Sequence, residues 1–428
     1  MKLFPTIRRG RVALLGWLLI AVPLHAVPGS KPNVVLIMAD DIGYECVSSY
    51  GSADYATPRI DQLAREGIRF MHGYSQPVCT PTRVQLLTGQ YNVRNYVKFG
   101  YLDPAQITFG HDLRAAGYRT GIAGKWQLGG DRNTIPDYGF DEYCLWWMER
   151  KSWRYGDVGE LIQNGEVLPG ERGEYGPDVI NAFALNFIEN NAERPFFLYY
   201  PMMLPHAPFV PTPDSKNATG WREEDPRYFK DMVAYMDQLV GRIVDKLDAL
   251  GLRENTLVVF MGDNGTNQEI TSRMIDGRLI QGGKSTPTDA GTRVPLVVSM
   301  PSVVPQGLVS EVLVDFSDLM PTFHDVVGYT PGAQRVIDGV SFWPVLQGES
   351  ATEREWSYCW YAKEGQEDDV AIFARTIRFK LYADGRMFDL ARDPLETSVL
   401  SQTSELQAMR SHLRAVIERY AQVETIRQ

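Results

Sequence analysis

The sequence predicts an α/β fold built around a largely parallel sheet, and three observations lead to that class. Short, nearly continuous apolar runs rich in β-branched residues recur along the chain, as in strands buried on both faces. Segments with helical spacing of apolar residues separate the early runs, as in βαβ units. Polar residues follow the ends of these runs, and open α/β sheets bind their ligands at the carboxyl ends of strands.

The strands and helices of this sheet are expected in alternation over the first two thirds of the chain. Pro58 at a first turn and Gly67 at a stop predict a helix over 58–67, and a long apolar stripe predicts another over 225–250. A short helix is expected at 111–117. The predicted strands cover 33–39, 68–74, 118–123, 195–200, 256–261 and 296–300.

The pattern changes beyond about Gly348. Strand-like segments at 370–375, 379–383 and 387–390, with the turn Asp384-Gly385, predict an antiparallel meander, and a helix is expected at 404–420. A chain of 428 residues is long for a single core. We therefore expect a main domain over 27–347 and a smaller α+β lobe over 348–428.

Composition limits the function. A hydrophobic fraction of 44% with 22% charged residues is ordinary for a soluble globular protein. The net charge of -10 argues against a general nucleic-acid binder, which normally carries a basic face. If such an acidic chain binds an anionic substrate, it must concentrate positive charge in a pocket, so individual Arg and Lys positions become informative.

The N-terminus predicts export. Residues 1–26 have a basic start, an apolar run from Val12 to Leu24 and Ala26 before Val27, which is typical of a secretory signal peptide. The run is short for a membrane span and no later run is long enough, so no stable membrane span is expected. The expected location is secreted or periplasmic, and a retained N-terminal anchor is the alternative.

Polar groups of particular chemistry follow the predicted strands. Asp40 and Asp41 follow the strand 33–39, where two adjacent acids repel unless a cation neutralises them. The alternative is a solvated turn in which one acid caps a helix. Asp263-Asn264 follows the strand 256–261. Gly-rich turns carry Lys125 and Lys284, and His206 lies between two prolines.

The segment Cys79-Thr80-Pro81-Thr82-Arg83 is the strongest single motif. Pro81 fixes φ and Arg83 begins a predicted helix, so Cys79 lies just before a helix N-terminus, where the field favours an anionic ligand. A modified or nucleophilic group suits that position. The alternative is a buried free cysteine in a Pro-containing turn.

These motifs resemble, in their order along the chain, those of the type I sulfatases of the alkaline-phosphatase-like superfamily, over nearly all of the mature chain. The motifs that carry the likeness are Asp40-Asp41, the cysteine segment with Leu87-Thr88-Gly89, Gly124-Lys125-Trp126, His206-Ala207-Pro208, Gly262-Asp263-Asn264-Gly265 and Lys284 with Asp289-Ala290-Gly291. The likeness implies a mixed, mostly parallel sheet between helices with a smaller C-terminal antiparallel sheet. It implies that 27–347 is the catalytic domain.

The likeness also implies a reaction, the hydrolysis of sulfate esters. Cys79 would be converted to formylglycine (3-oxoalanine) by a formylglycine-generating enzyme, and one hydroxyl of its hydrate would attack sulfur while the other later expels sulfate. Arg83 would hold this hydrate, and Lys125, His206 and Lys284 would bind the sulfate and assist the leaving oxygen. The implied cation is Ca²⁺ or, alternatively, Mg²⁺, held by Asp40, Asp41, Asp263, Asn264 and the group derived from Cys79. Since Cys79 would be consumed, Cys46, Cys144 and Cys359 remain, and no disulfide framework is predicted.

One departure concerns Gln127, at a substrate-binding position where the family generally has His. An amide hydrogen-bonds but exchanges no proton near neutral pH. Either another group such as His72 or His111 acts as base, or turnover is slow, or the chain is a weakly active homologue that binds sulfated glycans. A phosphodiesterase or phosphonate hydrolase of the same superfamily is the other alternative.

Two aromatic segments bear on the substrate. Trp146–Tyr155 and Trp356–Tyr361 combine aromatic rings with cations, which suits sulfated sugars, although plain packing also explains them. Export favours an extracellular sulfated carbohydrate over an internal metabolite, and an aryl sulfate is the alternative substrate. His324 is expected to be a buried structural histidine.

Overall fold

The structure is a computed structural model. It describes residues 31–146, 153–157, 159–169, 173–216, 218–349, 354–365 and 370–423. The predicted signal peptide at 1–26 and the middle of the first aromatic segment, residues 147–152, lie outside the described residues.

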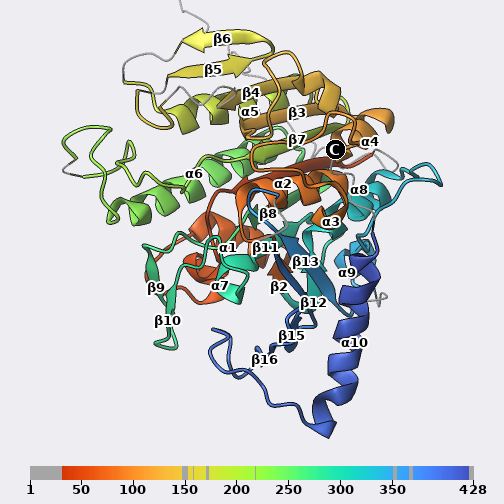
Figure 1. Ribbon diagram of the computed structural model, residues 1–428. Coiled ribbons are helices and arrows are strands. Elements are labelled where there is room, and N and C mark those ends of the chain that lie inside the picture. Colours follow the sequence, from red (N-terminus) through yellow and green to blue (C-terminus); the bar gives the residue numbers. More distant parts are fainter. Residues whose placement is uncertain are drawn as a thin grey trace, which may run out of the picture.

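A ten-stranded sheet forms the centre of the molecule (Figure 1). Its spatial order is β12-β2-β11-β8-β1-β7-β3-β4-β5-β6. The strands are β1 (Asn33–Ala39), β2 (Ile68–Tyr74), β3 (Arg119–Lys125), β4 (Glu142–Trp146), β5 (Glu160–Gln163), β6 (Glu166–Pro169), β7 (Phe196–Pro201), β8 (Thr256–Gly262), β11 (Arg293–Ser299) and β12 (Leu308–Asp315).

Five neighbouring strands, β8-β1-β7-β3-β4, are parallel throughout. β11 is antiparallel to both of its neighbours, and β5 is antiparallel to β4 and β6. The predicted mixed and mostly parallel sheet is therefore confirmed. The parallel block brings the carboxyl ends of β8, β1, β7 and β3 to one edge, which is where the site lies.

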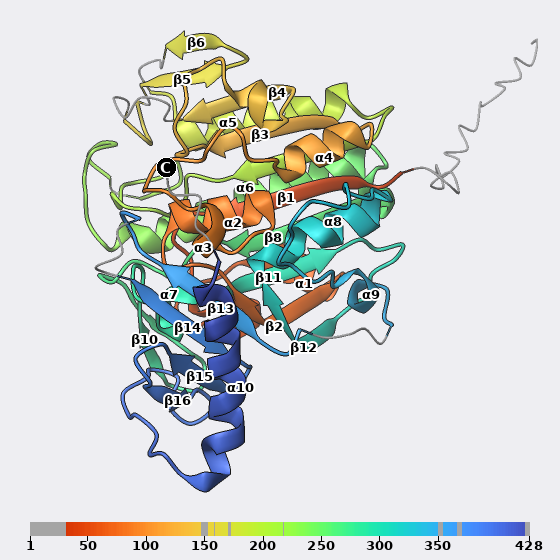
Figure 2. The ribbon, with the colours of Figure 1, turned by 45° about the vertical axis from the view of Figure 1, so that its right-hand side comes forward.

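Helices cover both faces of the sheet (Figures 1 and 2). One layer contains α1 (Pro58–Arg65), α5 (Gly176–Asn190) and α6 (Tyr228–Ala249). The other contains α2 (Cys79–Thr88), α4 (Phe109–Ala115) and α8 (Leu319–Val327). Strand β1 shows why both faces need cover: Val34, Leu36 and Met38 pack in one core cluster, and the alternate residues Val35 and Ile37 pack in the other.

The C-terminal part forms a second, antiparallel sheet (Figure 2). Its order is β13-β14-β15-β16, and α10 (Ser404–Ala421) packs against β14 and β15. Its strands are β13 (Ser357–Tyr361), β14 (Ala371–Arg375), β15 (Phe379–Tyr382) and β16 (Met387–Asp389). This confirms the smaller α+β lobe. Cys359 and Tyr361 of β13 share a hydrophobic cluster with Cys79, so the lobe abuts the cysteine motif.

Shorter elements complete the described chain. They are α3 (Asn92–Asn95), α7 (Asp289–Thr292), α9 (Trp343–Leu346) and the hairpin β9 (Thr271–Arg273) with β10 (Leu279–Gln281). α4 begins two residues before the predicted helix because the Thr108 hydroxyl accepts from Gly110 N and His111 Nδ1 accepts from Thr108 N, a capping box. Within the described ranges, no helix has the length and apolar character needed to cross a membrane.

Candidate functional site

The predicted polar residues converge at the carboxyl edge of the parallel strands. Asp40 and Asp41 follow β1, Asp263 directly follows β8, and Lys125 is the last residue of β3. His206 lies five residues beyond β7. Because β8, β1, β7 and β3 are neighbours running in one direction, their ends bring these side chains together.

Helix α2 begins at Cys79 itself rather than after it. Pro81 lies in the first turn, where a missing N–H costs no helical hydrogen bond, and Gly89 ends the helix with φ 66°. The Cys79 side chain is buried and its Sγ donates to Gln127 Oε1 at 3.1 Å. Burial raises the pKa of this thiol, although Lys125 opposes the change. The unmodified thiol is therefore a poor nucleophile.

Arg83 lies one turn along the same helix and is 1% exposed. Its Nη1 donates to the backbone oxygen of Lys125 at 2.9 Å, and its Nη2 donates to Asp263 Oδ2 at 3.0 Å. The guanidinium thus ties α2 to the ends of β3 and β8. A buried charge held in this way keeps its geometry when the neighbouring group reacts.

Two cationic side chains form ion pairs with the Asp40 carboxylate. Lys125 Nζ lies 2.9 Å and 2.8 Å from its two carboxylate oxygens, and Arg154 Nη1 lies 3.1 Å from Oδ2. Burial is the largest single influence and raises the pKa of Asp40, but the positive charges around the carboxylate, Lys125 first among them, together hold that pKa well below its ordinary value. Arg154 was not predicted as a site residue. Its only signal in the sequence was its place as a cation within the aromatic segment.

Asp41, His206 and Lys284 form the other half of the site. Lys284 Nζ donates to Asp41 Oδ2 at 2.5 Å and lies 3.0 Å from His206 Nε2. Burial, together with the positive charge of Arg154, lowers the pKa of His206 to about 3. The neutral ring then donates from Nδ1 to the Ala207 carbonyl at 2.5 Å, which leaves Nε2 as an acceptor toward Lys284.

The backbone of the site is held in uncommon conformations. Asp41, Gln127 and Ser285 have φ values of 65°, 55° and 72°, in the left-handed region that non-Gly residues seldom occupy. Such residues gather at functional sites because the surrounding structure must enforce them. Gly124 has φ 131°, and a Cβ there would meet the Pro201 oxygen at 1.8 Å, so only glycine lets β3 deliver Lys125 beside β7.

The acidic residues fit a hard cation. Ligand atoms of Asp40, Asp41 and His206 lie within 4.8 Å of one another. Asn264 Oδ1 is buried and has no hydrogen-bond partner among the described residues, while its Nδ2 donates to Asp41 Oδ1 at 2.9 Å. Burial and the negative charge of Asp40 raise the pKa of Asp263. A cation bound beside the two carboxylates would relieve the repulsion between them. An orphaned buried acceptor beside crowded carboxylates is what an oxygen-ligated Ca²⁺ or Mg²⁺ would satisfy.

The group of ligand atoms around Asp40 and Asp41 also includes His206, which we predicted to bind sulfate and not the cation. Asp263 uses Oδ1 to accept from Asp41 N at 2.9 Å and Oδ2 to accept from Arg83. Asp263 thereby holds Asp41 and Arg83 in place, and the remaining lone pairs of its carboxylate oxygens are available to an ion.

The other histidines considered as bases lie elsewhere. His111 caps α4, and His72 pairs with Glu311 at 3.0 Å across β2 and β12. His324 is buried against Asp112 at 2.8 Å, a structural contact. None of these three histidines replaces the missing group beside Cys79.

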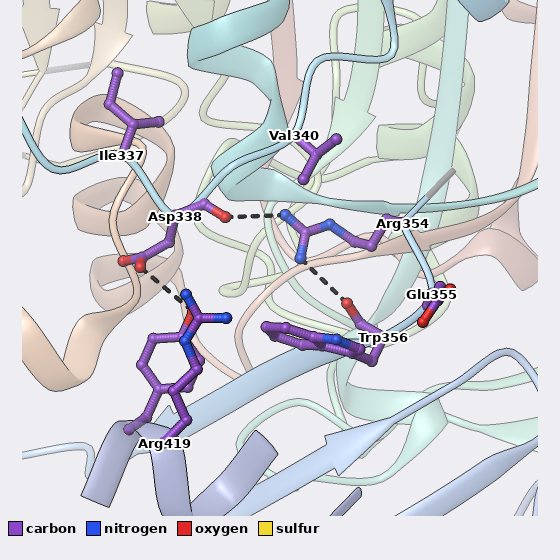
Figure 3. A pocket seen from close by; sticks show the side chains of 8 residues that line it. Ile337, Asp338, Val340, Arg354, Glu355, Trp356 and Arg419 are labelled. Carbon is purple, nitrogen blue, oxygen red and sulfur yellow. Dashed lines mark hydrogen bonds between the residues drawn. The ribbon is translucent and has the colours of Figure 1, made fainter. Parts of the chain in front are cut away.

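Trp356 of the second aromatic segment lines a separate pocket of about 330 Å³ (Figure 3). Arg354 points into it but is already bound: Nη1 donates to the Trp356 oxygen and Nη2 to the Asp338 oxygen, and Arg354 also forms an ion pair with Asp318. Trp356 lies just before the first residue of β13. Tyr361, which packs near Cys79, is the last residue of that strand, so the two aromatic residues lie at opposite ends of it. Packing therefore accounts for this segment.

The sheet and the residues at its carboxyl edge define a member of the alkaline-phosphatase-like class. The chain matches the family model described as Sulfatase over residues 32–329, and one described as N-sulphoglucosamine sulphohydrolase, C-terminal, over 284–423. The first match covers well over half of the chain, which therefore belongs to the sulfatase family.

Known relatives agree with this assignment. The chain is 31% identical over 371 residues to Arylsulfatase of Hemicentrotus pulcherrimus, covering 79% of this chain and 66% of that protein. It is 31% identical over 387 residues to N-acetylgalactosamine-6-sulfatase of Canis lupus familiaris, covering 80% and 72%. The crystal structure of Ps i-CgsB in complex with k-i-k-neocarrahexaose matches with a TM-score of 0.78 at 26% identity, covering 92% of this chain and 93% of that chain.

Proposed function

We propose that this protein hydrolyses sulfate esters on an extracellular sulfated carbohydrate. The observation that carries the proposal is the set of cations around Cys79. The positive charges of Lys125 and Lys284 favour an anion at its thiol, and Arg83 lies one turn away on α2. Positive charge fixed around a reacting anion is usually the largest electrostatic contribution to such catalysis. A relative named N-acetylgalactosamine-6-sulfatase and a similar structure solved in complex with k-i-k-neocarrahexaose support the carbohydrate.

Each side chain then has a role within this proposal. A formylglycine at position 79 would supply, when hydrated, a nucleophilic hydroxyl, and a divalent cation held by Asp40, Asp41 and Asn264 would supply positive charge to polarise the ester. Arg83 orients the residue at position 79. Lys125 and Lys284 bind sulfate oxygens, and the His206 Nε2 that faces Lys284 accepts or returns a proton near the leaving oxygen.

Export belongs to the same proposal. A signal peptide at 1–26 would place the enzyme outside the cytoplasm, secreted or periplasmic, where sulfated polysaccharides are found. Maturation requires a formylglycine-generating enzyme in the producing cell, so the expression host determines whether the protein is active.

Gln127 supports a second candidate, a weakly active protein that binds sulfated glycans. Its Oε1 accepts from Cys79 Sγ at 3.1 Å, so the residue that departs from the family pattern touches the group that would react. This candidate predicts tight binding of a sulfated oligosaccharide without release of inorganic sulfate.

The deciding experiment combines mass and activity. The peptide containing Cys79, taken from protein made in a host with the converting enzyme, should show replacement of sulfur and two hydrogens by one oxygen. That protein should release sulfate from an aryl sulfate and faster from a sulfated sugar, whereas Cys79→Ala should release none. Faster cleavage of an aryl phosphate diester would instead favour the phosphodiesterase. A converted protein that binds sulfated sugars but releases no sulfate would overturn the proposal.

A further inference from the structure

Thr266 lies two residues beyond Asn264 and joins two loops of the site. Its side chain is fully buried, and its hydroxyl accepts from Gly43 N at 2.9 Å, in the loop that follows Asp41. Its carbonyl oxygen accepts from Lys284 N at 3.0 Å. One residue therefore contacts both the loop that carries Asp41 and the turn that carries Lys284.

The hydrogen-bonding capacity of the Thr266 hydroxyl is fully used. The hydroxyl donates to Glu45 Oε1 at 2.6 Å, and Cys46 Sγ lies 3.3 Å from Oγ1. Because a hydroxyl has one proton and can accept two hydrogen bonds, the Cys46 thiol and Gly43 N are the two donors. All three of these partners lie within residues 43–46, so the side chain holds one short segment of the loop after β1.

Asp41 depends on support from its surroundings. Its φ of 65° lies in the left-handed region, which a non-Gly residue keeps only where the neighbouring structure enforces it. Asn264 Nδ2 donates to Asp41 Oδ1 at 2.9 Å, and Lys284 Nζ donates to Oδ2 at 2.5 Å. Asn264 and Lys284 are both tied to the Thr266 backbone. A loop that moved relative to Thr266 would therefore alter both contacts of the Asp41 carboxylate.

We propose that Thr266 is a positioning residue that holds Asp41 in place to bind the divalent cation. The inference rests on the proposed function and deepens it, since Asp41 is one of the residues proposed to hold that ion. Valine has nearly the same shape as threonine, so it would fill the same space and leave Gly43 N without its acceptor. In a purely structural role, Thr266 would satisfy buried polar groups without affecting the ion.

The test measures the dissociation constant of Ca²⁺, or of Mg²⁺ if the wild type prefers it, by calorimetry on protein from a host with the converting enzyme. Thr266→Val should weaken binding of the ion about tenfold, as expected when a buried donor loses its acceptor. Thr266→Ser keeps the hydroxyl and should stay within about threefold of the wild type.

The matched control is Thr322→Val on α8, a helix that carries none of the proposed site residues. The Thr322 hydroxyl is also buried, accepts from Phe342 N at 3.1 Å and donates to the Asp318 oxygen at 2.7 Å. Its loss should lower the thermal stability and leave the affinity for the ion unchanged.

Sulfate release at different ion concentrations adds a second readout. Thr266→Val should release less sulfate from an aryl sulfate than the wild type at limiting ion, and most of its kcat should return at saturating ion. Thr322→Val should show the wild-type dependence on the ion, because its site is intact.

Calorimetry needs no turnover, so a converted wild type that binds the ion but releases no sulfate would count only against the proposed function. A Thr266→Val protein that is less stable and still binds the ion as tightly as the wild type would overturn the inference and leave Thr266 a structural role. Equal losses of affinity in Thr266→Val and Thr322→Val would overturn it as well. If Thr266→Val does not fold, Thr266→Cys gives the same comparison, because a thiol is a weaker hydrogen-bonding partner than a hydroxyl.

Discussion

Gln127 is the residue at which this chain departs from its family while keeping the geometry of the site. Its φ of 55° lies in the left-handed region, where His is tolerated better than most side chains. A histidine therefore fits this backbone, and the amide is a difference in chemistry and not a consequence of the fold.

Gln127→His should increase turnover, because an imidazole at this position restores a proton acceptor beside the group at position 79. General bases contribute roughly 10²–10⁴-fold, so kcat for an aryl sulfate should rise by about 10²-fold. The measurement is steady-state release of inorganic sulfate. Gln127→Asn, which keeps an amide, serves as the control and should give no gain. Equal kcat in the wild type and Gln127→His would show that another group already handles the proton.

Glu45 is a buried acid that the site chemistry does not use. Its Oε1 accepts from the Thr266 hydroxyl at 2.6 Å, and Oε2 has no partner among the described residues. Burial raises the pKa of Glu45 from 4.5 to about 6. The folded state therefore binds the proton more tightly than the unfolded chain, so the stabilisation is complete below pH 4.5 and is lost as pH rises through about 6.

Glu45→Gln should flatten this pH dependence. The wild type should lose about 1.5 kcal/mol from this group between pH 4.5 and pH 6.5, most of the about 2 kcal/mol that the whole pKa shift is worth. Chemical denaturation across this interval measures the slope. Glu269→Gln, an exposed charge removal, should leave the slope unchanged. A Glu45→Gln protein with the wild-type slope would show that Glu45 is not the responsible group.

At the scale of elements, the Asp237 side chain of α6 caps the start of α1 and so joins two helices of the same layer. Asp237 of α6 accepts from Arg59 N at 3.0 Å and Ile60 N at 2.9 Å, at the start of α1. These N–H groups have no acceptor within α1, and the carboxylate also meets the positive end of the helix dipole.

Asp237→Ala should therefore lower the free energy of unfolding by about 1–3 kcal/mol, the cost of leaving buried donors unpaired. Asp245→Ala provides the control, because Asp245 lies on the same helix and pairs with Arg59 at the exposed surface. It should change stability by less than about 0.5 kcal/mol. Similar losses for both variants in urea denaturation would contradict a capping role for Asp237.

Elements with a strong apolar pattern could be predicted from the sequence, and elements without one could not. β1 and β8 are buried on both faces and were expected within a residue of their ends. β6 is an edge strand with no buried residue, so it leaves no alternation to detect. Helix α2 was expected after Cys79, yet it starts there, since Val78 already takes an extended cap conformation.

The site follows the same rule. Motifs placed at strand ends were brought together as the parallel topology requires. Arg154 escaped prediction because its approach to Asp40 depends on Tyr155 binding the carbonyl of His206, a contact between residues 51 apart in the chain. No local pattern encodes such a contact.

At the scale of the whole molecule, the C-terminal lobe holds the segment that carries Lys284. Arg375 of β14 pairs with Asp289 at 2.5 Å, and both side chains are buried. Glu396 joins Lys380 of β15 at 2.8 Å and accepts from Asp289 N at 3.2 Å. Asp289 begins α7, five residues after Lys284, so the smaller sheet anchors one of the cations proposed to bind sulfate.

Arg375→Ala should therefore affect stability and sulfate binding together. Arg375 is the strongest of the cations that act on the buried Asp289 carboxylate, and removing one member of a buried ion pair costs about 3–5 kcal/mol. The affinity for inorganic sulfate should also fall, because the Lys284 segment loses its anchor. Thermal unfolding and calorimetric titration with sulfate measure the two effects, and Asp289→Asn with Arg375→Ala should recover much of the stability because no buried charge then remains unpaired. The exposed pair Arg386–Asp384 supplies the control, since Arg386→Ala should cost only about 0–1 kcal/mol. If Arg375→Ala is destabilised but binds sulfate as tightly as the wild type, the lobe supports the fold without positioning Lys284.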